Sequence, residues 1–189
     1  MRLVPLLLVC LATASHAAET RKPNVIYYPV HGASAKAIKD DIIQHGPRIG
    51  GRSAFSFTIP AIKVSKKAVQ SGGSCHFKTY RIASVYNFVL PRLAATKGLP
   101  RQTQTNWNAF SSYLKAHENQ HRQIWLTCLS EFENEARALE ASSCDSLEKA
   151  ATRAFERKKL ACLEEDQRLD FYYTKEVLKL PFMREAAGK

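Results

Sequence analysis

The chain has 189 residues, of which 45% are hydrophobic, 24% charged and 10% aromatic. This is the composition of a globular protein. It excludes disordered and collagen-like classes, and the length suits one domain or two very small ones. The longest apolar run lies at the N-terminus and has about a dozen residues, whereas a membrane span needs ~20. We therefore expect no transmembrane anchor.

The N-terminal segment has the pattern of a secretory signal. Arg2 precedes the apolar stretch Leu3–Leu11, and Ser15-His16-Ala17 offers small residues for cleavage. We expect residues 1–18 to be removed as a signal peptide, which makes the mature protein secreted or periplasmic. A lipid anchor on Cys10 is the alternative, although Val9 stands where a small residue is expected.

Positive charge is concentrated in the first half of the chain. The net charge is +11; residues 19–100 hold 13 Lys/Arg against 3 Asp/Glu, and residues 101–189 hold 14 of each. The basic half can contact an anionic envelope polymer, or it can be a solvated surface without a partner. Because no basic motif interleaved with aromatic residues is present, we expect no specific nucleic-acid partner.

Short elements separated by glycine and proline are predicted before residue 101. Asn24–Val30 has the composition of a strand, and Ala35–Gln44 has apolar residues at helical spacing. Ala54–Val64 is predicted as a strand that Pro60 places at an edge or a bulge. Cys75–Leu90 is predicted as one long strand or a pair of strands.

Two long helices are predicted after residue 100, because neither glycine nor proline occurs between Pro100 and Pro181. The first is expected to begin at a Thr105 cap and to end near Ala141. The second is expected to begin at Asp145, whose spacing to a glutamate resembles a capping box. Residues 181–189 are predicted as a flexible tail.

These elements define the expected fold class. It is α+β, with a small N-terminal mixed α/β part, whose few-stranded sheet packs on a long C-terminal antiparallel helical hairpin. The strand-rich basic half would cover residues 19–100 and the helical half residues 101–180.

The segment His117-Glu118-Asn119-Gln120-His121 is an H-E-x-x-H motif within the first predicted long helix. Its imidazoles are four residues apart on one helical face, where both can bind one Zn²⁺. Glu118 lies beside them and can take a proton from a water that the metal has acidified. The histidines interrupt an apolar stripe, so we expect them to face inward. The alternative is a pair of hydrogen-bonded core histidines.

Several weaker motifs accompany this one in the same order as in a known family. They are Tyr28-Pro29-Val30-His31-Gly32, Gly46-Pro47, the Cys75 strand, Leu90-Pro91-Arg92, Trp107 ten residues before His117, and Cys144-Asp145-Ser146-Leu147. With the H-E-x-x-H motif they resemble the bacterial family of unknown function whose members are described as predicted secreted Zn-dependent proteases.

The resemblance covers most of the mature chain and implies one zincin-like metallopeptidase domain over residues 19–180. It also implies a zinc cofactor bound by His117 and His121, with Glu118 as the base. The sequence departs from the family's Tyr-Asp-x-x-Thr-x-His-Gly in the segment that begins at Leu169. There Asp170 matches, Thr174 is displaced by one position, and the His-Gly pair is absent.

Two functions of different classes are consistent with these features. The first is a secreted zinc metallopeptidase, in which water assisted by Glu118 attacks a peptide bond of a peptide or protein substrate aligned by an edge strand. The second is a non-catalytic, zinc-stabilised envelope module that grips an anionic polymer through its basic half. Glu118 favours the enzyme, because a structural zinc site needs no base beside its ligands.

The four cysteines of the predicted mature chain allow three disulfide connectivities. Cys128 and Cys144 are separated by roughly 24 Å along a helix, and Cys144 and Cys162 by a similar distance. A disulfide needs Cα atoms within about 7 Å. The remaining connectivity joins Cys128 to Cys162 across the hairpin and Cys75 to Cys144 at its turn.

This pairing also predicts a third metal ligand. With Cys128 opposite Cys162, position 120 faces 170 and position 117 faces 173, so Asp170 lies against the histidines. Tyr173 is then close enough to donate a hydrogen bond to an oxyanion. The rival ligand is Glu140, which a continuous helix would place roughly 28 Å from His121. Asp170 could instead be a surface or helix-pairing carboxylate.

Overall fold

The computed structural model describes residues 22–189, so the predicted signal peptide lies outside the described residues. In these residues five strands and one helix precede residue 100, and the chain is mainly helical afterwards, as predicted. In chain order they are β1 (Asn24–Val30), α1 (Ala35–His45), β2 (Arg48–Ile49), β3 (Arg52–Ser53), β4 (Phe57–Ser71), β5 (Ser74–Leu93), α2 (Arg101–Arg137), β6 (Glu140–Ala141), α3 (Cys144–Val177) and α4 (Pro181–Ala186).

The main sheet is built around β5, which is one continuous strand. β1 pairs with it in parallel, β4 pairs antiparallel along most of its length, and β6 pairs antiparallel at Cys75 and His76. Alternate residues of β5 are buried, because one face of the sheet is covered by a helix and the other is open. Pro60 lies on β4, which is an edge strand as predicted.

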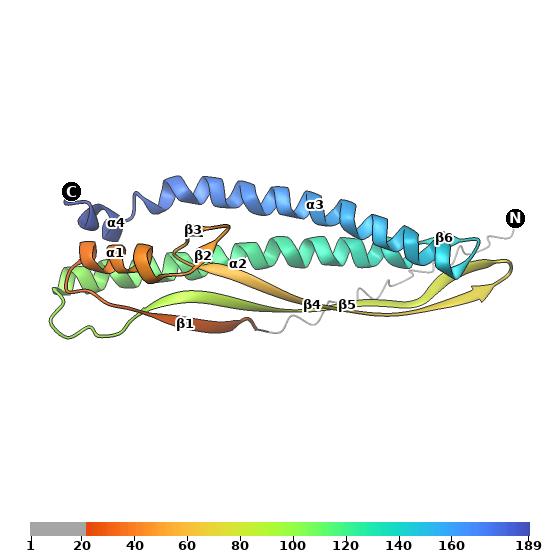
Figure 1. The fold of residues 1–189 in the computed structure, drawn as a ribbon, viewed down its shortest axis with the longest axis horizontal. Helices are drawn as coiled ribbons and strands as arrows, with labels where there is room; N and C mark the ends of the chain where they lie inside the picture. Colours follow the sequence, from red (N-terminus) through yellow and green to blue (C-terminus); the bar gives the residue numbers. More distant parts are fainter. Residues whose placement is uncertain (1–21) are drawn as a thin grey trace, which may run out of the picture.

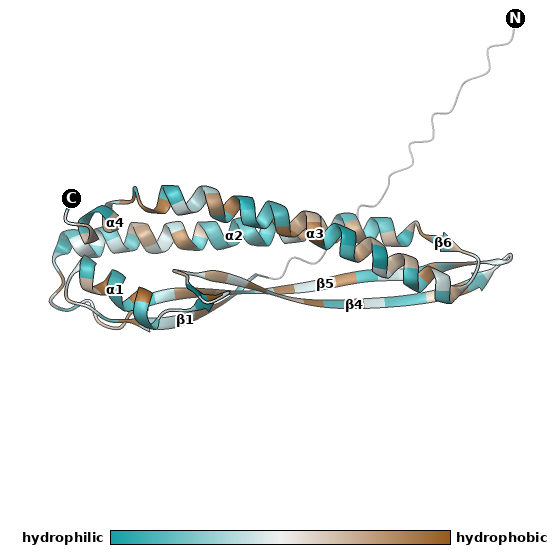
Figure 2. Cartoon of the chain, turned by 45° about the horizontal axis from the view of Figure 1, so that its top comes forward, coloured by the Kyte–Doolittle hydropathy of each residue, from teal (hydrophilic) through white to brown (hydrophobic). Residues whose placement is uncertain are grey.

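The helices form two further layers over this sheet. α2 lies between the sheet and α3, and the two long helices run as an antiparallel hairpin (Figure 1). Hydrophilic residues predominate along much of α3, whose outer side faces solvent (Figure 2). The predicted α+β class and helical hairpin are therefore confirmed. None of the helices in the described part of the chain is long and apolar enough to cross a membrane.

The predicted ends of the long helices were wrong by two to five residues. α2 begins after Pro100, and the Thr105 hydroxyl bonds back to the Arg101 carbonyl inside the first turn. α2 ends at Arg137, because the following residues leave the helix to form β6. The side-chain cap of α3 is Ser143, which accepts a hydrogen bond from the Ser146 amide, whereas Asp145 lies within the first turn.

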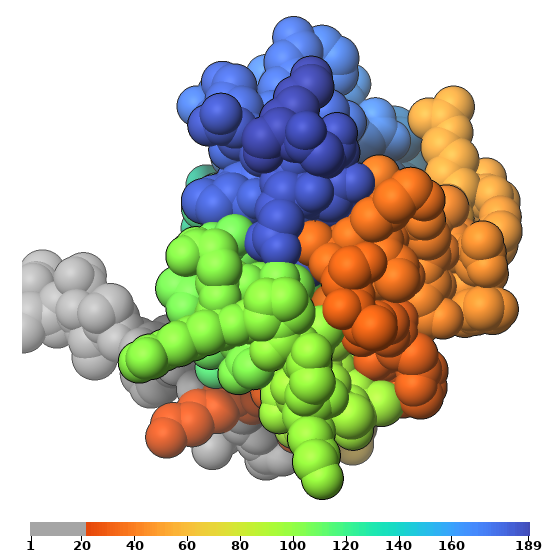
Figure 3. All heavy atoms as spheres, turned by 90° about the vertical axis from the view of Figure 1, so that its left-hand side faces the viewer, coloured from red at the N-terminus to blue at the C-terminus, as the bar shows by residue number. Residues whose placement is uncertain are grey.

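The C-terminal segment is not the flexible tail that the sequence predicted, because α4 occupies it. The Phe182 side chain is fully buried, with its ring 4.9 Å from Phe110 and 5.3 Å from Trp107 between centroids. Figure 3 views the molecule from this end, where α4 lies beside α1. The apolar pair Phe182 and Met183 is too short to show helical periodicity, so its burial was not apparent from the sequence.

We expect Phe182→Ala to lower the free energy of unfolding by about 3–5 kcal/mol, because it leaves a cavity beside the rings of Phe110 and Trp107. Leu178, which is 59% exposed, provides a matched control, and Leu178→Ala should change the stability by less than about 0.5 kcal/mol. Urea unfolding followed by tryptophan fluorescence measures both. Equal effects of the two substitutions would show that α4 does not belong to the core.

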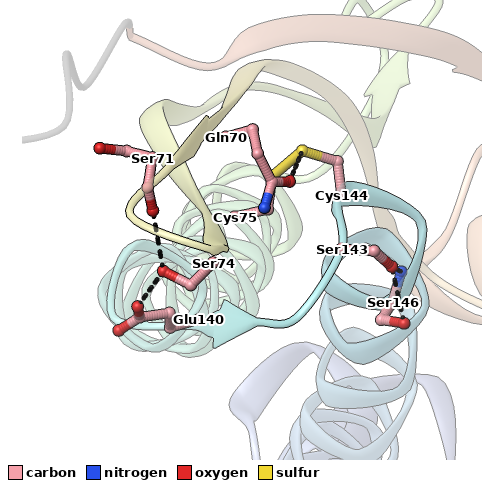
Figure 4. The surroundings of a disulfide bond; sticks show 8 residues. All are labelled: Gln70, Ser71, Ser74, Cys75, Glu140, Ser143, Cys144 and Ser146. Carbon is pink, nitrogen blue, oxygen red and sulfur yellow. Dashed lines mark hydrogen bonds between the residues drawn. A yellow bond between two sulfur atoms is a disulfide. The ribbon is translucent and has the colours of Figure 1, made fainter.

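Both predicted disulfides are present, Cys75–Cys144 and Cys128–Cys162. The first joins β5 to the start of α3, close to the contact of β6 with the sheet (Figure 4). The second joins α2 to α3 within the hairpin. Two disulfides fit an oxidising compartment.

Candidate metal centre

A polar break divides the hydrophobic interior of the helical hairpin. One apolar cluster includes Leu114 of α2 and Val177 of α3, and a second includes Leu129 of α2 and Ala154 of α3. The H-E-x-x-H motif lies on α2 between these clusters, and its His117, Glu118 and His121 are buried there. Buried polar groups require partners, and those of the two histidines come from the facing turns of α3.

Three donor atoms converge at this break. His117 Nε2 and His121 Nε2 each lie 3.1 Å from Asp170 Oδ1, and the two nitrogens are 3.0 Å apart. Within residues 22–189, no other group of three or more His, Cys, Asp or Glu side chains brings its donor atoms together in this way. The register predicted from the disulfide therefore placed Asp170 correctly against both histidines.

The donor set fits a zinc ion. Tetrahedral Zn²⁺ with bonds of ~2.0–2.1 Å holds its ligand atoms roughly 3.3 Å apart, so the observed separations need only a slight widening. Two imidazoles and one carboxylate are ligands that zinc commonly takes, and three protein ligands leave a fourth position open. The Asp170 carboxylate is largely exposed, so the cluster can be reached from solvent.

Asp166 orients one of the two imidazoles. Its Oδ1 atom lies 2.7 Å from His121 Nδ1, the nitrogen on the opposite side of the ring from Asp170. Burial lowers the pKa of His121, but the hydrogen bonds with Asp166 and Asp170 outweigh burial and raise this pKa to about 10. For Asp170, burial raises the pKa, and the hydrogen bonds with both histidines outweigh it and hold the pKa below its usual value.

We expect Asp166→Asn to weaken zinc binding about 10- to 100-fold, because a carboxylate behind a ligating histidine fixes the ring and increases its basicity. Competition with a chromophoric chelator measures the affinity. Glu164→Gln, two residues away on the same helix, is the control and should leave the affinity unchanged. An affinity unchanged in Asp166→Asn would mean that packing alone orients His121.

The Glu118 side chain points toward the sheet rather than toward solvent. It is fully buried; Oε1 accepts a hydrogen bond of 2.5 Å from Ser56 Oγ, and Oε2 accepts one of 2.7 Å from Thr58 Oγ1. Both hydroxyls come from the start of β4 and the residue just before it. The carboxylate is thus held next to His117 by a part of the chain about 60 residues away.

A pocket of about 440 Å³ adjoins the cluster. It lies between the two long helices and the segment that leads from β2 into β4. His117, Asp170, Tyr173 and Ser56 line it, whereas Glu118 does not, so the Ser56 hydroxyl separates the Glu118 carboxylate from the pocket.

Tyr173 lies at the pocket beside the cluster, as predicted. Its ring centroid is 3.9 Å from that of His117, and its hydroxyl accepts a hydrogen bond of 2.7 Å from Gln120 Nε2. Because the hydroxyl accepts this bond, its own proton is available to a group in the pocket. Burial raises the pKa of Tyr173, which keeps the phenol protonated.

Glu140, the rival ligand, lies at the other end of the hairpin. It belongs to β6, where it faces His76 of β5 and accepts a hydrogen bond from Ser74 (Figure 4). For Glu140 to reach His121, the helix would have to end between them and the chain would have to fold back. The helix does end, at Arg137, but the residues that follow form β6 and pair with the sheet. Glu140 is not part of the cluster.

Two features of the site were missed by sequence reasoning. Asp166 precedes Asp170 by one helical turn on the same stripe, so the register could have identified it as the partner of His121. Ser56 and Thr58 carry no such signal, because their proximity to Glu118 depends on how the sheet packs against α2.

Comparison with known proteins identifies the family of this chain but neither a reaction nor a ligand. No curated protein and no solved structure matches the chain. A family model matches residues 25–172, which extend from β1 to the turn of α3 that follows Asp170. Both motif histidines, Glu118, Asp166 and Asp170 lie within this match. The chain therefore belongs to the family described as bacterial protein of unknown function, DUF922.

Proposed function

We propose that the protein is a zinc-dependent peptide hydrolase that works outside the cytoplasm after removal of a signal peptide. One observation carries the proposal: two imidazole nitrogens and a carboxylate oxygen converge within 3.1 Å beside a pocket large enough for part of a peptide. His117, His121 and Asp170 would hold the ion. Catalytic zinc sites in proteins use such a three-ligand set with an open position, whereas structural sites are closed by a fourth protein ligand.

Bound zinc would acidify a water and polarise the substrate carbonyl. The protein's own contribution begins with Glu118, the base that the motif predicts. Ser56 lines the pocket and donates to Glu118, which does not line it. We therefore propose two linked proton transfers: a water in the pocket gives a proton to Ser56 Oγ, and the proton of the Ser56 hydroxyl passes to Glu118 Oε1. The second transfer follows the hydrogen bond from Ser56 Oγ to Glu118 Oε1, and the first requires the water to come within hydrogen-bonding distance of Ser56 Oγ.

Tyr173 would stabilise the negative charge that develops on the carbonyl oxygen. A neutral phenol with a free proton at the pocket wall is a suitable donor for an oxyanion. The extended segment before β4, which lines the same pocket, is the part of the chain against which a peptide backbone would lie.

The test combines metal content with hydrolysis. The mature chain is expected to contain one zinc per molecule and to cleave members of a broad library of unfolded peptides, detected by mass spectrometry. A chelator should stop cleavage, and added zinc should restore it. A zinc-loaded wild-type chain that cleaves nothing in the library would overturn the proposal.

A second candidate function is a zinc-stabilised module that binds an anionic envelope polymer. Lys66 on β4 contacts Glu148 of α3, so its side chain points toward the helices. Because side chains alternate along a strand, Lys63 and Lys67 lie on the opposite face of the sheet, in the part of β4 before the bulge. Arg81 pairs with Ser65 across the strands and therefore lies on the same face as Lys63 and Lys67. Among the described residues, none forms an ion pair with Lys63, Lys67 or Arg81. Salt-dependent retention on an anionic polysaccharide, lost in Lys63→Gln/Lys67→Gln, would favour this candidate.

A further inference from the structure

The pocket beside the metal cluster contains an arginine, and we propose that this residue, Arg52, binds a carboxylate group of the substrate. The inference rests on the peptide hydrolase proposed above and adds the class of peptide that it would take. Among the residues of the described chain that line the pocket, Arg52 is the only basic residue besides His117 of the cluster, and Asp170 is the only acidic one. Since Asp170 faces the two histidines, Arg52 is the charged group left for a substrate.

A short hairpin holds Arg52 at the pocket. β2 and β3 are joined by Gly50 and Gly51, both with positive φ (+55° and +81°), which the tightest two-residue hairpin turn requires. Beyond the turn, Ser53 Oγ donates a hydrogen bond of 2.8 Å to the Ile43 carbonyl of α1. The Ala54 amide donates one of 2.9 Å to the Pro47 carbonyl. The backbone around Arg52 is thus tied to α1 on one side of the long helices (Figure 1).

The Arg52 guanidinium has no partner of its own within residues 22–189. In this part of the chain no carboxylate forms an ion pair with it, and it does not stack on an aromatic ring. Arg48, the other arginine of the hairpin, differs because its Nη1 donates to the Gly51 carbonyl and the side chain does not line the pocket. The two arginines therefore provide a matched pair, one at the pocket and one away from it.

Charge and shape favour a carboxylate at this position. With a divalent cation on two neutral histidines and one carboxylate, the cluster carries +1, and Arg52 adds another +1 to the same pocket. The planar guanidinium matches a carboxylate in a two-pronged arrangement. Arg52 is itself exposed, and Phe55, Leu114 and Val177 provide apolar wall in the same pocket, where the rest of a substrate side chain or backbone could pack. The carboxylate belongs either to the C-terminus of the peptide or to an acidic side chain.

The experiment measures binding, so it does not depend on turnover. Isothermal titration compares two peptide pairs on the zinc-loaded chain: one pair differs only in a C-terminal acid or amide, the other only in an internal Glu or Gln. In the wild type, the acidic member of one pair is expected to bind about 10- to 100-fold more tightly. Arg52→Gln should abolish this preference, while Arg48→Gln should retain it. The pair that shows the preference identifies the source of the carboxylate.

Equal binding within both pairs by the wild type would overturn the inference, as would a preference that survives in Arg52→Gln. A preference lost equally in Arg48→Gln would also overturn it, because it would reflect the general charge of the hairpin. Hydrolysis of the same peptides separates this inference from the function on which it rests. Binding that depends on Arg52 without any cleavage would refute the hydrolase alone, and cleavage indifferent to Arg52 would refute the carboxylate site alone.

Discussion

Replacement of His117 or His121 by alanine is expected to abolish stoichiometric zinc binding, whereas the wild-type chain should keep one zinc per molecule through dialysis. Each imidazole supplies one of only three protein donor atoms, which lie 3.0–3.1 Å apart. Loss of a direct ligand should exceed the roughly 10- to 100-fold weakening expected when an outer partner is lost. Elemental analysis of the dialysed proteins measures the zinc content. Retention of zinc by both variants would refute the proposed centre.

Three further variants identify the remaining ligand and exclude nonspecific effects. Asp170→Ala should lose zinc, while Glu140→Ala should retain it, because Glu140 lies at the β6 end of the hairpin. His45→Ala is the control for histidine loss, since His45 pairs with Asp41 on α1 away from the cluster. The wild-type affinity should also rise with pH, because His121, whose pKa is raised to about 10, must lose its proton before it can bind the metal.

The helical half could be predicted from the sequence because its signals are local. A stretch of 80 residues without glycine or proline indicates long helices, and helix geometry then restricts which cysteines can meet. The Cys128–Cys162 pair fixed the register closely enough to find Asp170. It predicted that position 117 faces 173, and the His117 and Tyr173 rings are in contact, with their centroids 3.9 Å apart. It also predicted that position 120 faces 170, whereas Gln120 contacts Tyr173. The error is less than one helical turn.

The side of the site formed by the first half of the chain could not be predicted in this way. The contact of Ser56 with Glu118 and the position of Arg52 at the pocket depend on how β4 and the β2–β3 hairpin lie against α2. Those contacts join residues about 60 positions apart, and no periodicity or spacing encodes them. The same reason explains why the sequence placed Glu118 beside the histidines without indicating that its carboxylate turns toward the sheet.

Glu118→Gln and Ser56→Ala are both expected to lower kcat for peptide hydrolysis by about 10²- to 10⁴-fold while the zinc content stays at one per molecule. The glutamine amide cannot take a proton, yet it can accept a hydrogen bond from one hydroxyl and donate to the other, so the fold should persist. Alanine at position 56 leaves Glu118 intact but removes the hydroxyl between its carboxylate and the pocket.

Thr58→Ala distinguishes proton transfer from simple positioning. Thr58 and Ser56 each donate one hydrogen bond to the Glu118 carboxylate, but only Ser56 lines the pocket. If the hydroxyls merely hold the carboxylate, both alanine variants should lose comparable activity, and the relay would be wrong. If Ser56 passes the proton, Thr58→Ala should lose less than about tenfold, while Ser56→Ala falls close to the level of Glu118→Gln. Full activity in Glu118→Gln would instead show that the base is a different residue, since the amide leaves no acceptor for the proton at the end of this hydrogen-bonded path.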